Sequence, residues 1–367
     1  MKTTILQEHL IKLLSRVNKI ITPKTHLPVL STILLETHDG QLKGTATSPE
    51  STIIVLANAK VDKEGGVCVP AKTILEFVAS LPQDKVVMEE KDGHLTMVCN
   101  GYRASIPCMA KEEFPPVVTK GKHGVKIAKE SALDAIRAVS YAAATDEGRP
   151  ILTGVRITGK DKETTLVATD GYRLSLKTIR TEQNTDLSAT IPARALIEAG
   201  HIGDEEKEEK TITLSPVVDG QIGIFVADTE IYARALDGEY PNYEKIIPRS
   251  FTTSAVVDKE QFLRAVKSAS IFARDNANIV KIHFENDEIT IAANAPQTGE
   301  NTVTMGAKTK GDAGDIAFNS RFLLEYLNNL PEDQFVFEMT GSLNPGAFRP
   351  VGDESALHII MPVRVQS

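Results

Sequence analysis

The residues that could carry catalytic chemistry in this chain are scattered rather than clustered. The eight histidines form no H-x-x-x-H pair, and none has metal-ligand spacing to a cysteine. Cys68, Cys99 and Cys108 form no C-x-x-C pair, so we expect reduced thiols. The sequence also lacks a phosphate-binding glycine loop, a dinucleotide fingerprint and a nucleophile elbow. We therefore expect no catalytic residues, no metal and no cofactor.

Two charged features remain as candidate sites. The acidic run at 204–209 lacks the glycine turn and the spaced oxygens of a calcium loop, so we expect a solvated loop. Asp170 and Arg173 are the first residues to suspect if the chain is an enzyme. Asp170 is better suited to cap a turn in which Gly171 takes a positive φ. An enzyme with an active site between repeated domains stays open as an alternative.

The segments that would position these residues recur three times along the chain. A short helix after a strand, a strand ending at a proline corner, and a strand–turn–strand unit all return with a period of about 122–127 residues. Their markers are Pro70, Pro192 and Asn319, then Pro115 and Pro241, then Pro28 and Pro150. Copies of this length each hold a core. The sequence therefore predicts three tandem domains, at 1–121, 122–250 and 251–367.

Each copy opens with an amphipathic helix. In the first copy the apolar residues at helical spacing are Leu10, Leu13, Leu14, Val17 and Ile21. A basic stripe with similar spacing consists of Lys12, Arg16 and Lys19. Strands follow, for example at 29–36 and 211–215, and then a second helix such as 71–80. This order predicts an α+β fold with helices on one side of antiparallel sheet.

Composition and charge exclude several classes of protein. No apolar run approaches the ~20 residues of a membrane helix, and the first ten residues lack the apolar core of a signal peptide, so we expect a cytoplasmic protein. With no tryptophan and 5% aromatic residues, base stacking is not the main device. The net charge of −8 is the wrong sign for a simple nucleic-acid binder. However, the first copy carries +1, and the helix faces are often basic.

Several stretches resemble one known family, the β subunit of bacterial DNA polymerase III, which is the processivity sliding clamp. They are HLPVLSTILLE, TDGYRLS at 169–175, YPNYEKIIP at 240–248, FNSRFLLEYL at 318–327 and the C-terminal IIMPVRV. The resemblance implies three similar domains per chain and two chains joined head to tail in a closed ring, with helices lining the hole. It implies a non-catalytic protein that encircles duplex DNA and confers processivity on the polymerase. A protein-only assembly scaffold is a third alternative.

DNA contact of this kind requires cations that meet phosphates without reading sequence. We predict that such cations lie on the inner faces of the helices. Lys24 and Arg149, on polar loops, resemble positions where the family touches DNA, although each could be an ordinary exposed cation. The candidates are Lys12, Arg16, Lys24, Lys72, Arg137, Arg149, Arg194 and Lys267.

The resemblance also implies a pocket for short apolar peptides of the polymerase III alpha subunit, the clamp loader, and other polymerases and repair proteins. Apolar side chains and an adaptable methionine suit such a groove, and the arginines can bind polar groups of the peptide. Taken alone, Leu152, Leu174 and Met361 would be read as core. The matching positions are Leu152, Thr169, Gly171, Tyr172, Arg173, Leu174, Pro241, Lys245, Ile246, Asn319, Phe322, Leu343, Pro345, Ile359, Met361, Pro362, Val363, Arg364 and Val365.

Ligand preference and assembly are less defined. Tyr172, Phe322 and Lys245 stand where the family often has His, Tyr and Arg, and Ala277 stands where a larger apolar residue can gate the pocket. For the contact between the two chains, the resemblance implies Ile106 and Cys108 on one side and Ile271 and Phe272 on the other. The alternative for these four residues is packing within one domain. A head-to-tail contact closes a ring if the rotation between domains is right.

Overall fold

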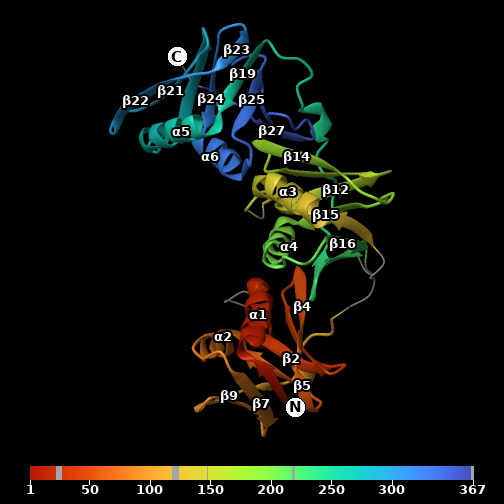
Figure 1. The fold of residues 1–367 in the computed structure, drawn as a ribbon. Coiled ribbons are helices and arrows are strands. Elements are labelled where there is room, and N and C mark those ends of the chain that lie inside the picture. The colour runs from red at the N-terminus through yellow and green to blue at the C-terminus, as the bar shows by residue number, and fades with distance from the viewer. Residues whose placement is uncertain (22–26, 118–123, 147, 217–219, 365–367) are drawn as a thin grey trace. The chain divides into compact units, whose positions relative to one another are not determined.

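The computed structural model describes residues 1–21, 27–117, 124–146, 148–216 and 220–364, and its chain forms two compact units (Figure 1). Unit 1 combines Met1–Glu130 with Ala195–Ala235. Unit 2 combines Ser131–Arg194 with Leu236–Ser367. The central repeat thus contributes to both units, which the period alone does not predict. The boundaries of the three predicted domains stay predictions.

Unit 1 contains two sheets in which all described strand pairs are antiparallel. The five-stranded sheet runs β5 (Lys60–Lys63), β1 (Lys2–Leu6), β7 (Lys85–Lys91), β8 (His94–Cys99), β9 (Tyr102–Pro107). The nine-stranded sheet runs β10 (Met109–Ala110), β6 (Gly66–Pro70), β2 (Thr32–His38), β3 (Gln41–Thr47), β4 (Ser51–Asn58), β18 (Thr229–Arg234), β17 (Gln221–Val226), β16 (Thr211–Pro216), β11 (Val125–Ala128). Within the second sheet β4 of the first copy pairs with β18 of the central copy, so one sheet crosses the boundary between copies.

The helices of unit 1 follow the predicted pattern closely. In α1 (Gln7–Val17) four of the five predicted apolar residues are buried. Gly44 on β3 lets this helix pack tightly, because a Cβ there would lie 2.3 Å from Leu13 Cδ2. The second helix, α2 (Ala71–Ala79), packs beside α1. The strand predicted at 29–36 begins later, at Thr32, because Pro28 starts a short 3-10 turn.

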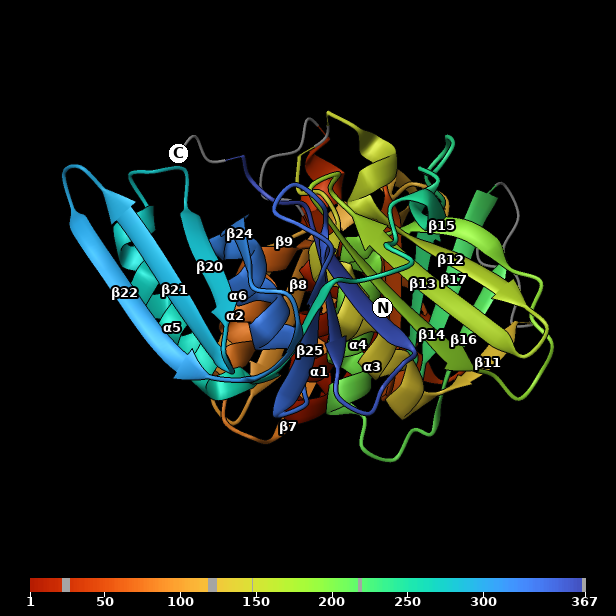
Figure 2. The same ribbon diagram turned by 90° about the horizontal axis from the view of Figure 1, so that it is seen from above.

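Unit 2 also has two antiparallel sheets (Figure 2). The nine-stranded sheet runs β15 (Ser188–Pro192), β12 (Gly154–Lys160), β13 (Glu163–Thr169), β14 (Arg173–Arg180), β27 (Ala356–Ile360), β26 (Gly346–Pro350), β25 (Gln334–Met339), β19 (Thr253–Asp258), β23 (Lys308–Gly311). The four-stranded sheet runs β22 (Gly299–Gly306), β21 (Glu288–Ala295), β20 (Ile279–Glu285), β24 (Gly314–Asn319). Here β14 of the central copy pairs with β27 of the third copy.

The third copy has an aromatic core beneath α5 (Lys259–Ala273) and α6 (Ser320–Asn329). Its rings pack closely, and those of Phe284 and Phe337 stack with centroids 4.7 Å apart. Both helices have side-chain caps: Asp258 accepts a hydrogen bond from the Gln261 amide, and Asn319 accepts one from the Arg321 amide. The remaining helices are α3 (Lys129–Val139) and α4 (Ala193–Glu205). The α+β class with antiparallel sheets is confirmed.

Arg16 differs from its prediction as an exposed, DNA-facing cation. Its side chain is 2% exposed and is held by carboxylates of the central copy within unit 1. Nη1 lies 2.6 Å from Asp228 Oδ1, and Nη2 lies 2.5 Å from Glu206 Oε1 and 3.2 Å from Glu205 Oε2. Burial would raise the pKa of Glu206, but hydrogen bonds from Lys12 and Arg16 outweigh it and lower that pKa. The predicted basic stripe therefore does not act as one surface: Lys12 is exposed, whereas Arg16 is buried and joins two copies. The prediction that Arg16 contacts DNA is corrected accordingly.

We predict that Arg16→Ala lowers the free energy of unfolding by about 2–4 kcal/mol, because it leaves three carboxylates facing one another without their shared cation. Lys12→Ala is the matched control, since Lys12 also pairs with Glu206 but is 43% exposed. We expect the control to cost less than about 1 kcal/mol. Denaturant titration measures both variants, and equal losses would contradict a structural role specific to Arg16.

Candidate functional site

The turn between β13 and β14 is fixed by its own side chains. Asp170 Oδ1 accepts hydrogen bonds from the amides of Tyr172 and Arg173, at 2.8 and 3.0 Å. Thr169 Oγ1 donates to the Arg173 carbonyl at 2.6 Å and accepts from the Gly171 amide at 3.0 Å. Gly171 has a φ of +93°, a conformation that glycine adopts without strain. Asp170 thus caps the turn as predicted, and the turn presents Tyr172 to solvent.

Arg173 lies beneath this turn and is used within the chain. Its Nε lies 3.1 Å from Asp170 Oδ2, its Nη1 2.5 Å from Glu325 Oε2 on α6, and its Nη2 donates to the Tyr141 carbonyl at 2.8 Å. The guanidinium carbon lies 4.7 Å from the centre of the Phe322 ring. Arg173 therefore has a positioning role within the chain, and its predicted contact with a peptide stays a prediction. It ties the turn, α6 and the segment at Tyr141 together.

Three predicted pocket residues meet at the end of β14 and β27. The Met361 amide donates to the Tyr172 carbonyl at 2.8 Å, which extends the strand pairing past Ile360. The rings of Tyr172 and Phe322 stack with centroids 6.5 Å apart. Tyr172 is 64% exposed and Met361 is 39% exposed. We call Tyr172, Phe322 and Met361 the aromatic–methionine patch.

Other apolar residues of the predicted pocket are buried in the chain itself. Leu174 lies opposite Ile359 in the strand pair, and both belong to a small core cluster. Leu152 is buried as well. In this structure Leu152, Leu174 and Ile359 are buried core residues and offer no free contact surface; we call these three residues the floor. This agrees with the alternative prediction that Leu152 and Leu174 are core residues. The cluster is partly covered by Tyr240, Tyr243, Ile247 and Phe251.

The segment that covers this cluster carries three more predicted residues. Pro241, Lys245 and Ile246 are all exposed. Lys245 lies in a short 3-10 turn that starts at Tyr243, one of the residues packed on the cluster. The exposed Ile246 side chain therefore lies on a segment that is anchored to the floor by its neighbours.

A separate depression of about 240 Å³ lies in unit 2 beside β24. It brings together the predicted residues Leu343 and Val363, and the Val363 amide donates to the Ala317 carbonyl at 2.8 Å. Leu343 is strongly exposed. The other lining residues are Lys281, Asp315, Ile316 and Ser342. Because Met361 precedes Val363 by two residues, the chain after β27 links this depression to the aromatic–methionine patch.

The remaining predicted pocket residues have varied surroundings. Asn319 is the cap of α6, so its side chain has a structural role. Pro345 and Pro362 are half-buried, and Arg364 is exposed. Val365 lies outside the described residues.

A buried polar cluster lies behind Arg173. His358 on β27 is 2% exposed, and its Nδ1 lies 2.7 Å from Ser175 Oγ and 3.2 Å from the Tyr141 hydroxyl. Its ring stacks on Tyr326 of α6 with centroids 4.8 Å apart. Burial lowers the pKa of His358 well below its usual value, and the positive charge of Arg173 lowers it further. The histidine is therefore neutral near pH 7, and it joins the central copy to the third.

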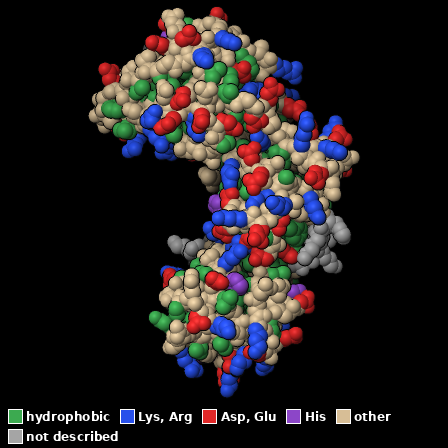
Figure 3. All heavy atoms as spheres, in the orientation of Figure 1, with side chains coloured by type: hydrophobic (Ala, Val, Ile, Leu, Met, Phe, Trp, Pro, Cys, Tyr) green, Lys and Arg blue, Asp and Glu red, His purple; other side chains and the backbone are tan. Residues whose placement is uncertain are grey.

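The predicted DNA-contacting cations are exposed except for Arg16, and Lys24 lies outside the described residues. Five of them lie on helices: Lys12 on α1, Lys72 on α2, Arg137 on α3, Arg194 on α4 and Lys267 on α5. Arg149 Nη2 donates to the Asp170 carbonyl at 3.2 Å, so it also supports the turn. In Figure 3, Lys and Arg side chains alternate with Asp and Glu on the face in view.

The predicted residues of the contact between chains are only partly exposed. Ile106 on β9 is buried inside unit 1, which agrees with the alternative of packing within one domain, and Cys108 is half-buried. On α5, Ile271 is 51% exposed, whereas Phe272 packs against the core of the third copy. The backbone provides more for a contact between chains than these side chains do, because β9 and β22 are each the last strand of a sheet.

Sequence reasoning missed Glu325, Tyr141 and His358. Glu325 follows Phe322 by three residues on α6, a spacing that puts both on one helix face. The spacing of Glu325 from Phe322 could therefore have indicated that Glu325 belongs to the site. For Tyr141 and His358 no signal exists in the sequence, because strand pairing between copies brings them together. Within the described residues, no group of three or more His, Cys, Asp or Glu side chains could hold a metal ion, and no helix is long and apolar enough to cross a membrane.

Comparisons with known proteins agree along the whole chain. The models of the DNA polymerase III beta subunit match its N-terminal domain at residues 1–118, its central domain at 126–242 and its C-terminal domain at 244–364. A beta sliding clamp of Synechococcus elongatus is 26% identical, with 100% of each chain covered.

Solved structures show the same fold. The DNA polymerase III beta subunit of Thermotoga maritima is 25% identical and superposes with a TM-score of 0.93, covering 100% of each chain. A sliding clamp of Pseudomonas aeruginosa bound to griselimycin is 22% identical, with a TM-score of 0.93 and 100% of each chain covered.

The buried histidine makes stability depend on pH. Because the pKa of folded His358 lies below 6.5, the unfolded chain binds more protons as the pH falls through 6.5. We predict that, because of His358, the free energy of unfolding of the wild type decreases by about 1 kcal/mol when the pH falls from 7.5 to 5.5. His358→Gln should remove this dependence in denaturant titrations at both pH values. Identical pH profiles for the two proteins would contradict the buried, neutral histidine.

Proposed function

Because this chain belongs to the DNA polymerase III beta subunit family, it is a non-catalytic processivity clamp, and we propose that the aromatic–methionine patch is where its partner proteins attach. DNA and a DNA polymerase are its partners. The enzyme alternative is not favoured, since the family is non-catalytic. The function of such a protein is to keep the polymerase near its template, where rebinding is effectively intramolecular and therefore fast.

The observation that carries the proposed docking site is the exposure of Tyr172 and Met361 on a rigid support. Solvent reaches both side chains, while hydrogen bonds fix their backbone where β14 begins and β27 ends. Apolar surface that is held in place loses little conformational entropy on binding. Short apolar segments of the polymerase III alpha subunit, the clamp loader, and other polymerases and repair proteins are the proposed ligands. Ile246 and Leu343 supply further exposed apolar contacts on neighbouring segments.

We propose that the DNA contacts come from the exposed helix cations, which are Lys12, Lys72, Arg137, Arg194 and Lys267, together with Arg149 and Lys24. Arg16 is left out because its charge is compensated inside unit 1. Such contacts are sequence-independent and weaken with salt. Two of these cations pair with carboxylates: Lys72 Nζ lies 3.9 Å from Glu76 Oε1 in an exposed pair, and Lys12 Nζ, on a side chain that is 43% exposed, lies 2.6 Å from Glu206 Oε1. Exposed pairs of this kind exchange partners at little cost.

The family's architecture is a ring of two chains, and we propose that this chain closes its ring through the free edges of β9 and β22. An edge strand carries unpaired backbone groups that can accept another strand. The exposed Ile271 on α5 adds apolar contact. Phe272 follows it on the same helix, and Cys108 directly follows β9. Ile106 supports β9 from inside. The proposed location is the cytoplasm, where duplex DNA and the polymerase are found.

Retention on DNA tests the topological link. We predict that the chain, loaded by its clamp loader onto a nicked plasmid circle, stays bound during gel filtration and is released when the circle is linearised. Release follows because a ring slides off a free end. A loader-free reaction is the control. Equal retention on circles and linear DNA would contradict encirclement, and no retention on either would favour a protein-only scaffold.

Met361→Asp tests the docking surface. Burying a carboxylate against a peptide's apolar side chains without a partner is costly, so we predict at least about a ten-fold loss of affinity. A labelled peptide from the polymerase III alpha subunit and griselimycin are the two probes, measured by fluorescence anisotropy and calorimetry.

Val351→Asp is the matched control, because Val351 is 42% exposed and directly follows β26, at the end of the β26–β27 pair that lies away from Met361. We expect this variant to bind both probes as the wild type does. Wild-type affinity in Met361→Asp would place the peptide elsewhere, and equal losses in both variants would indicate a general effect on folding.

A further inference from the structure

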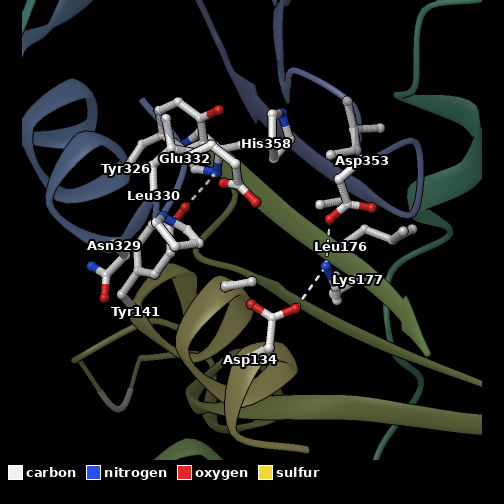
Figure 4. A pocket seen from close by; sticks show the side chains of 15 residues that line it. Asp134, Tyr141, Leu176, Lys177, Tyr326, Asn329, Leu330, Glu332, Asp353 and His358 are labelled. Carbon is white, nitrogen blue, oxygen red and sulfur yellow. Dashed lines mark hydrogen bonds and ion pairs between the residues drawn. The ribbon is translucent and has the colours of Figure 1, made fainter. Parts of the chain in front are cut away.

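A small cavity, partly open to solvent, lies in unit 2 where α3, β14, α6 and β27 meet (Figure 4). Its free volume is about 30 Å³. One ordered water needs at least about 10–15 Å³ of such space, so the cavity has room for one or two waters. Lys177 lies at one side between Asp134 and Asp353, with its Nζ 2.7 and 2.5 Å from their carboxylates. Tyr326, Glu332 and His358 lie together at another side.

These last three residues each carry a buried polar atom without a partner among the described residues. The atoms are the Tyr326 hydroxyl, Glu332 Oε2 and His358 Nε2. Tyr326 and His358 are 5% and 2% exposed. A buried polar atom that makes no hydrogen bond costs about 1–3 kcal/mol. All three residues line the same cavity, so a polar occupant of that cavity is the partner available to them.

The other groups around the histidine are already used. His358 Nδ1 is engaged by Ser175 and Tyr141, and the ring also makes a hydrogen bond with the Leu174 backbone, whereas Nε2 has no partner among the described residues. Lys177 is satisfied by its two carboxylates: burial would lower its pKa, but the hydrogen bonds that its ammonium donates to Asp134 and Asp353 outweigh burial and raise that pKa. An apolar occupant would leave all three atoms unpaired, and a cation would be repelled by the Lys177 ammonium, which lines the same cavity.

We propose that the cavity binds one ordered water molecule, which hydrogen-bonds Tyr326, Glu332 and His358 together. A water has two donors and two acceptors. It accepts from the Tyr326 hydroxyl and donates to Glu332 Oε2. Its remaining donor or acceptor meets His358 Nε2, in whichever neutral tautomer the ring adopts. All three atoms are thereby satisfied by one molecule of the right size.

This water has a defined place in the fold. Tyr326 and Glu332 belong to α6 and the segment after it, whereas His358 lies on β27 and is bonded to Ser175 and Tyr141 of the central copy. The water therefore completes a polar network that runs from α6 to β14 within unit 2. The same helix carries Glu325 and Phe322, which contact Arg173.

A crystal structure of the full chain at about 1.8 Å resolution tests the site directly. We expect a density peak within hydrogen-bonding distance, about 2.6–3.2 Å, of Tyr326 Oη, Glu332 Oε2 and His358 Nε2. A cavity without density would overturn the proposal. So would side chains that shift to pair directly with one another.

Variants give a second readout. Tyr326→Phe keeps the ring stacked on His358 but removes the donor, so the density peak should weaken and the unfolding equilibrium constant should rise about five- to ten-fold. Glu332→Gln retains an acceptor and should keep the peak. Tyr172→Phe, an exposed hydroxyl change, is the control and should leave stability unchanged. A Tyr326→Phe protein with wild-type stability and an unchanged peak would overturn the proposal. If this variant fails to fold, the wild-type density decides.

Discussion

The guanidinium of Arg173 is the group on which the arrangement of the exposed patch depends. It joins the turn after β13, helix α6 and the segment at Tyr141, through Asp170, Glu325 and a backbone carbonyl. Its flat face also supports the Phe322 ring, which in turn stacks on Tyr172. A planar cation with several fixed donors can make all these contacts at once, whereas lysine cannot. Exposed apolar residues are thus held by a buried charge.

A buried arginine held by carboxylates also occurs in unit 1, with different residues. Arg16 of the first copy is surrounded by Glu205, Glu206 and Asp228 of the central copy, and next to it β4 pairs with β18. In unit 2, Lys177 and Arg173 meet carboxylates of the third copy near the pairing of β14 with β27. Each boundary between copies therefore combines a continuous sheet with a cation that is held by acidic groups. Part of the chain's acidic surplus serves these internal contacts.

Local pattern was enough to predict the repeats, the amphipathic first helix, the capped turn at Asp170 and the α+β class. The helix, the turn and the class depend on residues within a few positions of one another, and the repeats on similar segments that return at one period. The burial of Arg16 and Ile106 and the neutral His358 could not be predicted, because each depends on a strand or helix of another copy or on a distant strand. Helical spacing makes Lys12 and Arg16 equivalent, and only tertiary contacts separate them. For the candidate site, the resemblance supplied the positions, while the division into floor and exposed patch came from the structure.

The two shared sheets also bear on how the chain can fold and be divided. A fragment that ended near residue 250 would lack β27, and β14 would become an edge with unpaired amides and carbonyls. The same holds for β4 in a fragment without β18. The three copies, although similar in sequence, are therefore not interchangeable modules that could be expressed singly. The central copy contributes to both compact units and has no sheet that belongs to it alone.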